Sequence, residues 1–318
     1  MVYIRSASSI SVQQPGGTVQ PVAFPAAVVE PDYKALISPA MLRRMAPIIK
    51  FSVAAGMDCL KQAGLEKPNA VVTGTGLGCL RDTQKFMEAF LTSDADTLSP
   101  TAFIQSTHNT ISGQIALMTT CHGYNMTFVQ NNLSFEYALL DSKMLVEEGT
   151  DYVLVGGADE RIEILNELAG KMQLSESFQH KISEGAAFFL LSNNSTDAVV
   201  KLLDVHAETR EDLQVEETVN TFLKKHGLIQ ADIDCLVYGV TDYNDSNAAV
   251  NFWLGPKINF IDYYGYFFTN SGLGLHIATD ALQGKYPQGF GLNEKPKRVL
   301  VLNQYQNKSL GLMLIQQP

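Results

Sequence analysis

The sequence has 318 residues, 46% hydrophobic and 18% charged, so the chain can bury a large core and lacks the composition of a disordered protein. Its formal net charge of −10 and isoelectric point near 5.1 exclude the basic field that a nucleic acid or an anionic membrane surface requires. The first residues, MVYIRSASSISV, contain no apolar run long enough for a signal peptide or a membrane span. We therefore expect a cytoplasmic protein that binds neither nucleic acid nor membrane.

The cysteines and histidines do not form a pattern typical of a metal site. The four cysteines lie far apart, without CxxC spacing and mostly in apolar surroundings: Cys59, Cys79, Cys121 and Cys235. This predicts reduced cysteines in or near the core of a cytosolic protein. His108, Cys121 and His122 lack a fourth ligand at usable spacing. The glycine-rich segment 74–78 lacks the Lys-Ser/Thr of a phosphate loop. From these two observations we expect neither a metal nor a nucleotide cofactor.

The first elements follow from hydrophobic periodicity and turn residues. A strand is predicted over 2–11, and a stretch punctuated by proline and glycine follows it. Apolar residues recur at helical spacing from residue 46 onward, and Gly64 suits the C′ position at which that helix ends. A strand over 70–76 comes next.

The stretch from Tyr124 to Glu160 reads as a strand, a tight turn, a helix and a second strand. Asn131, with Gln130 beside it, falls at the turn and therefore at the helix N-terminus, where exposed N–H groups favour a developing negative charge. A catalytic chain would place a nucleophile there, whereas an amide exchanges hydrogen bonds but does not attack a carbonyl carbon usefully. The two amides could also simply cap the helix.

The same order of elements occurs twice in the chain. Each pair of matching segments joins one from the first half to one from the second: 2–11 with 199–208, 70–76 with 235–242, 124–149 with 257–285, 152–159 with 298–305, and 184–193 with 308–317. The apolar runs are too continuous for a sheet with a solvated face, so both faces should be covered. We predict two βαβαβ halves, at 1–196 and 197–318, with the site-forming turns at the carboxyl ends of the strands.

With these elements in place, the sequence resembles the β-ketoacyl synthase branch of the thiolase-like superfamily over nearly its whole length. The segments that carry the resemblance are MLRRMAPIIKFSVAAGMDCLKQAGL, GTGLG, SPTAFIQSTHNTISGQIAL, YVLVGGADE and SEGAA. The resemblance implies an α/β fold of duplicated βαβαβ halves in a layered αβαβα arrangement. The chain is short for that family, and 160–183 is expected to be trimmed to a minimum.

In that family a cysteine at the turn attacks a thioester, and two histidines stabilise the oxygens that become negative. Counting back without a gap from Gly156 puts the cysteine position at Asn131. The first histidine opens an HGT motif that reads Tyr238-Gly239-Val240 here, and the second follows a glycine where this chain has Tyr266. The lysine of the family corresponds to Ile261. The resemblance therefore implies a frame without its catalytic residues.

The resemblance also implies which residues surround the former active site. The glycine-rich gate of the family survives only as NQYQN at 303–307. The expected lining of the degenerate pocket is Gln130, Asn131, Tyr238, Ile261, Tyr266, Phe268 and Asn303. The candidates for a dimer face are Phe103, Gln105, His108, Asn109 and Phe128. The aromatic run 260–268 would either plug the pocket or line a hydrophobic tunnel, and we favour the plug.

An amide in place of the cysteine is typical of chain length factors, the inactive subunits of ketosynthase heterodimers. The resemblance implies a non-catalytic subunit that pairs with an active β-ketoacyl-ACP synthase and shapes the tunnel for an acyl or polyene chain. More narrowly, the chain resembles the short, degenerate subunits of aryl-polyene and flexirubin-type pigment clusters. Because acyl carrier proteins are acidic like this chain, docking should use the basic surface of the partner. Two alternatives stay open: an acyltransferase or hydrolase with another nucleophile, such as Ser134 or Cys121, and a homodimeric binding or scaffold protein.

Overall fold

The computed structural model describes residues 1–15, 17–92, 100–241, 250–286, 290–292 and 294–318. Its strands are β1 Val2–Ile10, β2 Ala70–Gly74, β3 Asn125–Phe128, β4 Tyr152–Asp159, β5 Gly185–Ser192, β6 Val200–Thr209, β7 Cys235–Thr241, β8 Lys257–Asn259, β9 Arg298–Tyr305 and β10 Ser309–Gln316. Its α-helices are α1 Pro39–Leu42, α2 Pro47–Gln62, α3 Leu80–Thr92, α4 Pro100–Gln105, α5 Thr110–Thr119, α6 Ser134–Glu147, α7 Glu163–Lys171, α8 Glu176–Lys181, α9 Val215–Lys224, α10 Ile261–Tyr264 and α11 Ser271–Leu282. Short 3₁₀ turns lie at Tyr33–Ala35, Asn131–Leu133 and Gln230–Asp232.

The described strands form one sheet in the order β3-β2-β4-β5-β1-β6-β10-β9-β7-β8. Read outward from the β1–β6 junction, one side runs β1, β5, β4, β2, β3 and the other β6, β10, β9, β7, β8. Each strand thus holds the same place as the strand with which the sequence repeat paired it. The predicted fold class is confirmed, while the division of the chain at 196/197 stays a prediction.

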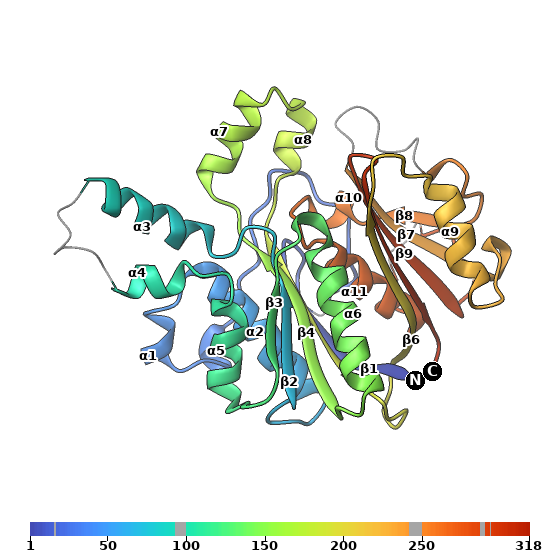
Figure 1. The fold of residues 1–318 in the computed structure, drawn as a ribbon, viewed down its shortest axis with the longest axis horizontal. Coiled ribbons are helices and arrows are strands. Elements are labelled where there is room, and N and C mark those ends of the chain that lie inside the picture. The colour runs from blue at the N-terminus through green and yellow to red at the C-terminus, as the bar shows by residue number, and fades with distance from the viewer. Residues whose placement is uncertain (16, 93–99, 242–249, 287–289, 293) are drawn as a thin grey trace.

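The helices form layers with the two halves of the sheet (Figure 1). Helix α2 covers the outer face of the first half, and α9 covers that of the second. Helices α6 and α11 lie between the halves and contact strands of both. Ten residues of α11 are buried, as expected of a helix enclosed on all sides, whereas α9 buries one stripe of residues.

Several sequence expectations can be compared with these elements. Helix α2 begins with a proline and is followed by Gly64 at φ +68°, the left-handed conformation predicted for its end. All four cysteines are buried, as predicted. The stretch 160–183 is not a minimal connection, because it contains α7 and α8, which project at the top of Figure 1. In the described part of the chain, no helix combines the length and apolarity needed to cross a membrane.

Candidate functional site

The turn between β3 and α6 presents Asn131 to solvent. Asn131 opens a 3₁₀ turn at φ +50°, a left-handed conformation that asparagine tolerates better than most residues. The turn is closed by Ser134, whose Oγ accepts from the Gln130 N–H (2.8 Å) and donates to the Asn131 carbonyl (2.6 Å). Neither amide side chain caps the helix, so the capping interpretation is wrong. Ser134 is fully buried with its hydroxyl engaged, which also removes it as a candidate nucleophile.

A buried polar contact beneath this turn joins the two halves of the fold. Asn303 of β9 donates its Nδ2 to the Asn132 carbonyl (2.7 Å) and to Glu136 Oε1 (2.8 Å). Burial raises the pKa of Glu136 to about 7, and the hydrogen bond from Asn303 opposes that rise. Asn303 is only 4% exposed, so it holds the backbone of the turn from below and does not form part of an open gate.

Tyr266 lies in a cluster of aromatic rings drawn from distant parts of the chain. Its ring centre is 5.1 Å from that of Phe178, 5.9 Å from that of Phe268 and 6.4 Å from that of Tyr305. Its backbone is fixed as well, because its N–H donates to the Lys181 carbonyl (2.6 Å). Ring packing and backbone pairing thus both hold Tyr266 in place.

The placement of Tyr238 differs from the prediction. Its side chain lies in the outer cluster beneath α9, together with Val250 and Trp253, and not in the central layer with Tyr266. Because side chains alternate along a strand, the neighbouring Gly239 faces the central layer. A Cβ at Gly239 would lie 2.2 Å from the Phe260 ring, so that ring fills the space. Tyr238 therefore packs in the outer cluster, on the other face of β7 from the Phe260 ring.

The aromatic run 260–268 fills the centre of the fold. Phe260, Ile261, Tyr263, Tyr264, Tyr266 and Phe267 are all buried in the central cluster. Phe268 is half-buried and packs on the loop after β2, where a Cβ on Gly76 would come within 2.3 Å of its Cβ. This close contact of rings with glycine backbone supports the plug interpretation over a tunnel.

Asp159, at the end of β4, organises the two loops that meet above the sheet. Its Oδ1 accepts from the Thr75 hydroxyl (3.0 Å) and from the Gly76 and Leu77 N–H groups (2.8 and 3.1 Å). Its Oδ2 accepts from the Thr269 N–H (3.0 Å) and hydroxyl (2.8 Å). Burial raises its pKa, and these donors oppose the rise. Sequence reasoning missed this role, although the acidic residue at the end of a buried strand, two positions after a pair of glycines, was a visible signal.

The sequence of the chain matches one family model over residues 18–230, the model described as "Beta-ketoacyl synthase, N-terminal domain". The chain belongs to the β-ketoacyl synthase family. A search of curated proteins found no match.

Solved structures of this family have the same fold. The ishigamide ketosynthase/chain length factor matches with a TM-score of 0.80 at 16% identity, covering 100% of this chain and 99% of that chain. A type II PKS acyl-carrier protein in complex with its ketosynthase matches with a TM-score of 0.78 at 14% identity, covering 100% and 99%. The ketosynthase ApeO in complex with its chain length factor ApeC from Xenorhabdus doucetiae matches with a TM-score of 0.72 at 16% identity, covering 100% and 98%. At these identities the likeness establishes the fold.

In this ketosynthase-family chain, β3 is a terminal strand of the described sheet and carries exposed apolar residues. Tyr124, Met126 and Val129, in and beside β3, are 40%, 41% and 42% exposed. Further exposed apolar side chains are Leu117 on α5, which contacts β3, and Phe103 and Ile104 on α4, which packs against α3. The edge is therefore both unpaired among the described residues and apolar.

The five residues predicted for a dimer face differ in their exposure. Phe103 is 56% exposed with its ring against Phe86, and His108 and Asn109 are exposed. Gln105 and Phe128 are partly buried: Gln105 donates to the Arg44 carbonyl, and the Phe128 carbonyl accepts from the Thr75 N–H.

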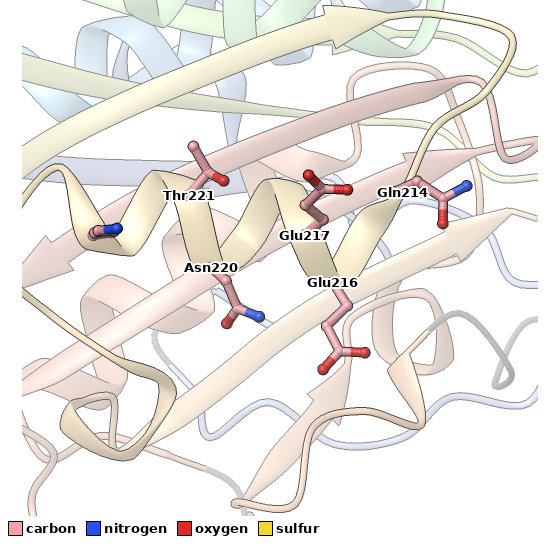
Figure 2. A pocket seen from close by; sticks show the side chains of 6 residues that line it. Gln214, Glu216, Glu217, Asn220 and Thr221 are labelled. Carbon is pink, nitrogen blue, oxygen red and sulfur yellow. The ribbon is translucent and has the colours of Figure 1, made fainter.

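A depression of about 430 Å³ along α9 has no features of a second site. Its described lining is Gln214, Glu216, Glu217, Asn220, Thr221 and Lys224. Figure 2 shows the labelled side chains leaving the helix in different directions, so they do not converge on one point. Within the described residues, no group of three His, Cys, Asp or Glu side chains is arranged to hold a metal ion.

Proposed function

We propose that this chain is a non-catalytic ketosynthase-like subunit of the chain-length-factor type, which pairs with an active β-ketoacyl-ACP synthase. The observation that carries this proposal is Asn131, an amide exposed at the turn where a ketosynthase needs a thiolate. The site around it supports the same conclusion. At the two positions where the resemblance puts the family's imidazoles, this chain has Tyr238, which packs in the outer cluster, and Tyr266, which packs among aromatic rings.

The β3 edge supplies a surface for the partner. A strand from a second subunit of the same fold can add to an unpaired edge through main-chain hydrogen bonds, while side chains such as Met126, Val129 and Leu117 lose contact with water. We propose that the partner is an active ketosynthase and that the pair holds a growing acyl or polyene chain, as in an aryl-polyene pathway. Since this chain is acidic, the acyl carrier protein docks on the partner.

The open alternatives fit the structure less well. Ser134 is buried with its hydroxyl engaged, and Cys121 is only 8% exposed, so neither is placed to attack an acyl group in this site. A homodimer would use the same edge strand, and the mass of the purified chain alone distinguishes it from a subunit that requires a partner.

The experiment is co-expression with a tagged active ketosynthase from the same organism. We expect a 1:1 complex in which Asn131→Ala changes product turnover by less than about twofold, because this side chain has no chemical role. Met126→Asp on the edge strand should abolish co-purification, since it buries an unpaired charge. The control is Ile229→Asp, at an exposed apolar side chain (65%, against 41% for Met126) beyond α9, which should leave the complex intact. A collapse of turnover in an intact Asn131→Ala complex would refute the non-catalytic role.

A further inference from the structure

A cavity of about 590 Å³ lies where the two halves of the sheet separate, away from the Asn131 turn. Strand β1 pairs with β5 from Tyr3 to Ile10 but with β6 only from Val2 to Ile4. From Arg5 to Ile10 no described strand pairs with the second edge of β1, and the cavity is lined by this edge together with α2 and α11. Since α2 and α11 lie on opposite faces of β1, the cavity sits at the strand edge.

Three residues of this wall have the arrangement of an activated nucleophile. The Ser9 hydroxyl is 2.8 Å from His276 Nδ1, and His276 Nε2 is 3.9 Å from Asp280 Oδ2, one helical turn further along α11. All three residues line the cavity, and the His276 side chain is 18% exposed. A nucleophile, a base in hydrogen-bond contact and a carboxylate on the far side of the base are the parts that acyl transfer requires.

The charged groups around His276 favour its role as a base. Burial lowers its pKa below the ordinary 6.5, and Asp280 opposes this shift while Lys285 adds to it. Asp58 on α2 and Arg5 on β1 also line the cavity; Asp58 accepts from Ser8 and Gln62, and Arg5 is paired with Asp197. The imidazole is therefore neutral at pH 7 and able to take a proton, and Asp280 would stabilise the resulting cation.

The open strand edge provides a donor for the oxygen that becomes negative. The Ser11 carbonyl bonds to the Val29 N–H, on the side away from β5. By the alternation along a strand, the backbone N–H of Ser9 points the same way, toward the cavity. There it can donate to an oxyanion formed on an acyl group attached to its own side chain. The apolar residues Val19, Leu36, Ala54 and Val199 line the same cavity and suit a short acyl chain.

We propose that Ser9, His276 and Asp280 form a second site that cleaves a short carboxylic ester or thioester. Ser9 Oγ bonds to the acyl carbon as its proton passes to His276 Nδ1. The bond from the acyl carbon to the leaving oxygen or sulfur then breaks, and the leaving group takes that proton. Water activated by His276 hydrolyses the acyl-Ser9 ester and releases the acid. This activity does not depend on a partner subunit.

The test uses the full chain and an alkyl fluorophosphonate, which forms a stable adduct with activated serines. We expect one adduct, mapped to Ser9 by mass spectrometry, which Ser9→Ala abolishes. His276→Gln should slow labelling at least about 100-fold, the contribution typical of a positioned base. Ser177→Ala is the control, because Ser177 is an exposed serine on α8, outside the cavity lining, with its hydroxyl 3.2 Å from that of Ser175; this variant should label at the wild-type rate.

The pH dependence separates a positioned base from a merely structural histidine. Labelling should rise as the pH passes upward through the pKa of His276, below 6.5, and Asp280→Asn should move this midpoint to lower pH because it removes the charge that raises the pKa. Thermal midpoints confirm that each variant is folded. Hydrolysis of p-nitrophenyl butyrate should follow the same order among the variants. No adduct at Ser9, or labelling that His276→Gln leaves undiminished, refutes the proposal.

Discussion

Asp159→Ala tests the buried hydrogen bonds that join the loop after β2 to the loop before α11. It removes an acceptor that is 2% exposed and holds five hydrogen bonds from two loops. The donors that remain are the N–H groups of Gly76, Leu77 and Thr269 and two hydroxyls. The hydroxyls can rotate toward other acceptors, whereas the three N–H groups cannot.

The expected loss of stability follows from this inventory. A buried donor left without an acceptor costs about 1–3 kcal/mol, so three give roughly 3–9 kcal/mol. Two effects reduce that figure: water can enter the space, and the desolvation that raises the pKa of Asp159 disappears with the carboxylate. We therefore expect a net loss of about 3–4 kcal/mol. Asp159→Asn keeps one acceptor oxygen and should lose about 1–2 kcal/mol.

Guanidinium denaturation followed by circular dichroism measures these differences. The matched control is Glu211→Gln, which removes a carboxylate of similar contact distance to Lys308 (2.7 Å) but 84% exposed. A surface pair of this kind should contribute less than about 1 kcal/mol. If Asp159→Ala destabilised the chain no more than Glu211→Gln, the assigned role of Asp159 in joining the two loops would be wrong.

Three further outcomes are expected. The pKa of Glu136 in the folded chain, about 7, lies above its ordinary value of 4.5, so ionisation of Glu136 reduces the free energy of unfolding as the pH rises from about 4.5 to 7. Glu136→Gln should therefore be more stable than wild type at pH 8, by up to about 3 kcal/mol. Near pH 4.5 the two proteins should be equally stable. Thermal unfolding across that pH range tests this, and a difference that does not vary with pH would contradict it. Gly239→Ala should cost about 1–3 kcal/mol because its Cβ would meet the Phe260 ring, and Phe260→Leu in the same chain should recover part of the loss; additive losses in denaturation would argue against the contact. Asn131→Cys should give a thiol at the exposed turn that iodoacetamide alkylates readily. The isolated variant should still not extend an acyl chain in a condensation assay, because the two imidazoles of the family are missing. Extension by that variant would show that other groups replace them.

The parts of this protein that its sequence determined are those that depend on local periodicity and on spacing along the chain. Continuous apolar strands, enclosed helices and their repetition in one order indicated two half-sheets with both faces covered, because such strands have no side that tolerates water. The sequence also located Asn131 at the turn, because one helix and one strand of fixed length separate that turn from Gly156.

Tertiary structure decided which side chains face the centre and which distant residues meet. Tyr238 and Gly239 are neighbours in β7, but neighbouring positions of a strand point to opposite faces, so Tyr238 packs in the outer cluster and Gly239 faces the Phe260 ring. Asn303 and Glu136 are 167 positions apart, and Ser9 and His276 are 267 apart. Such contacts arise only when the two halves close around α6 and α11, because nothing in the local sequence fixes the distance between residues on separate elements.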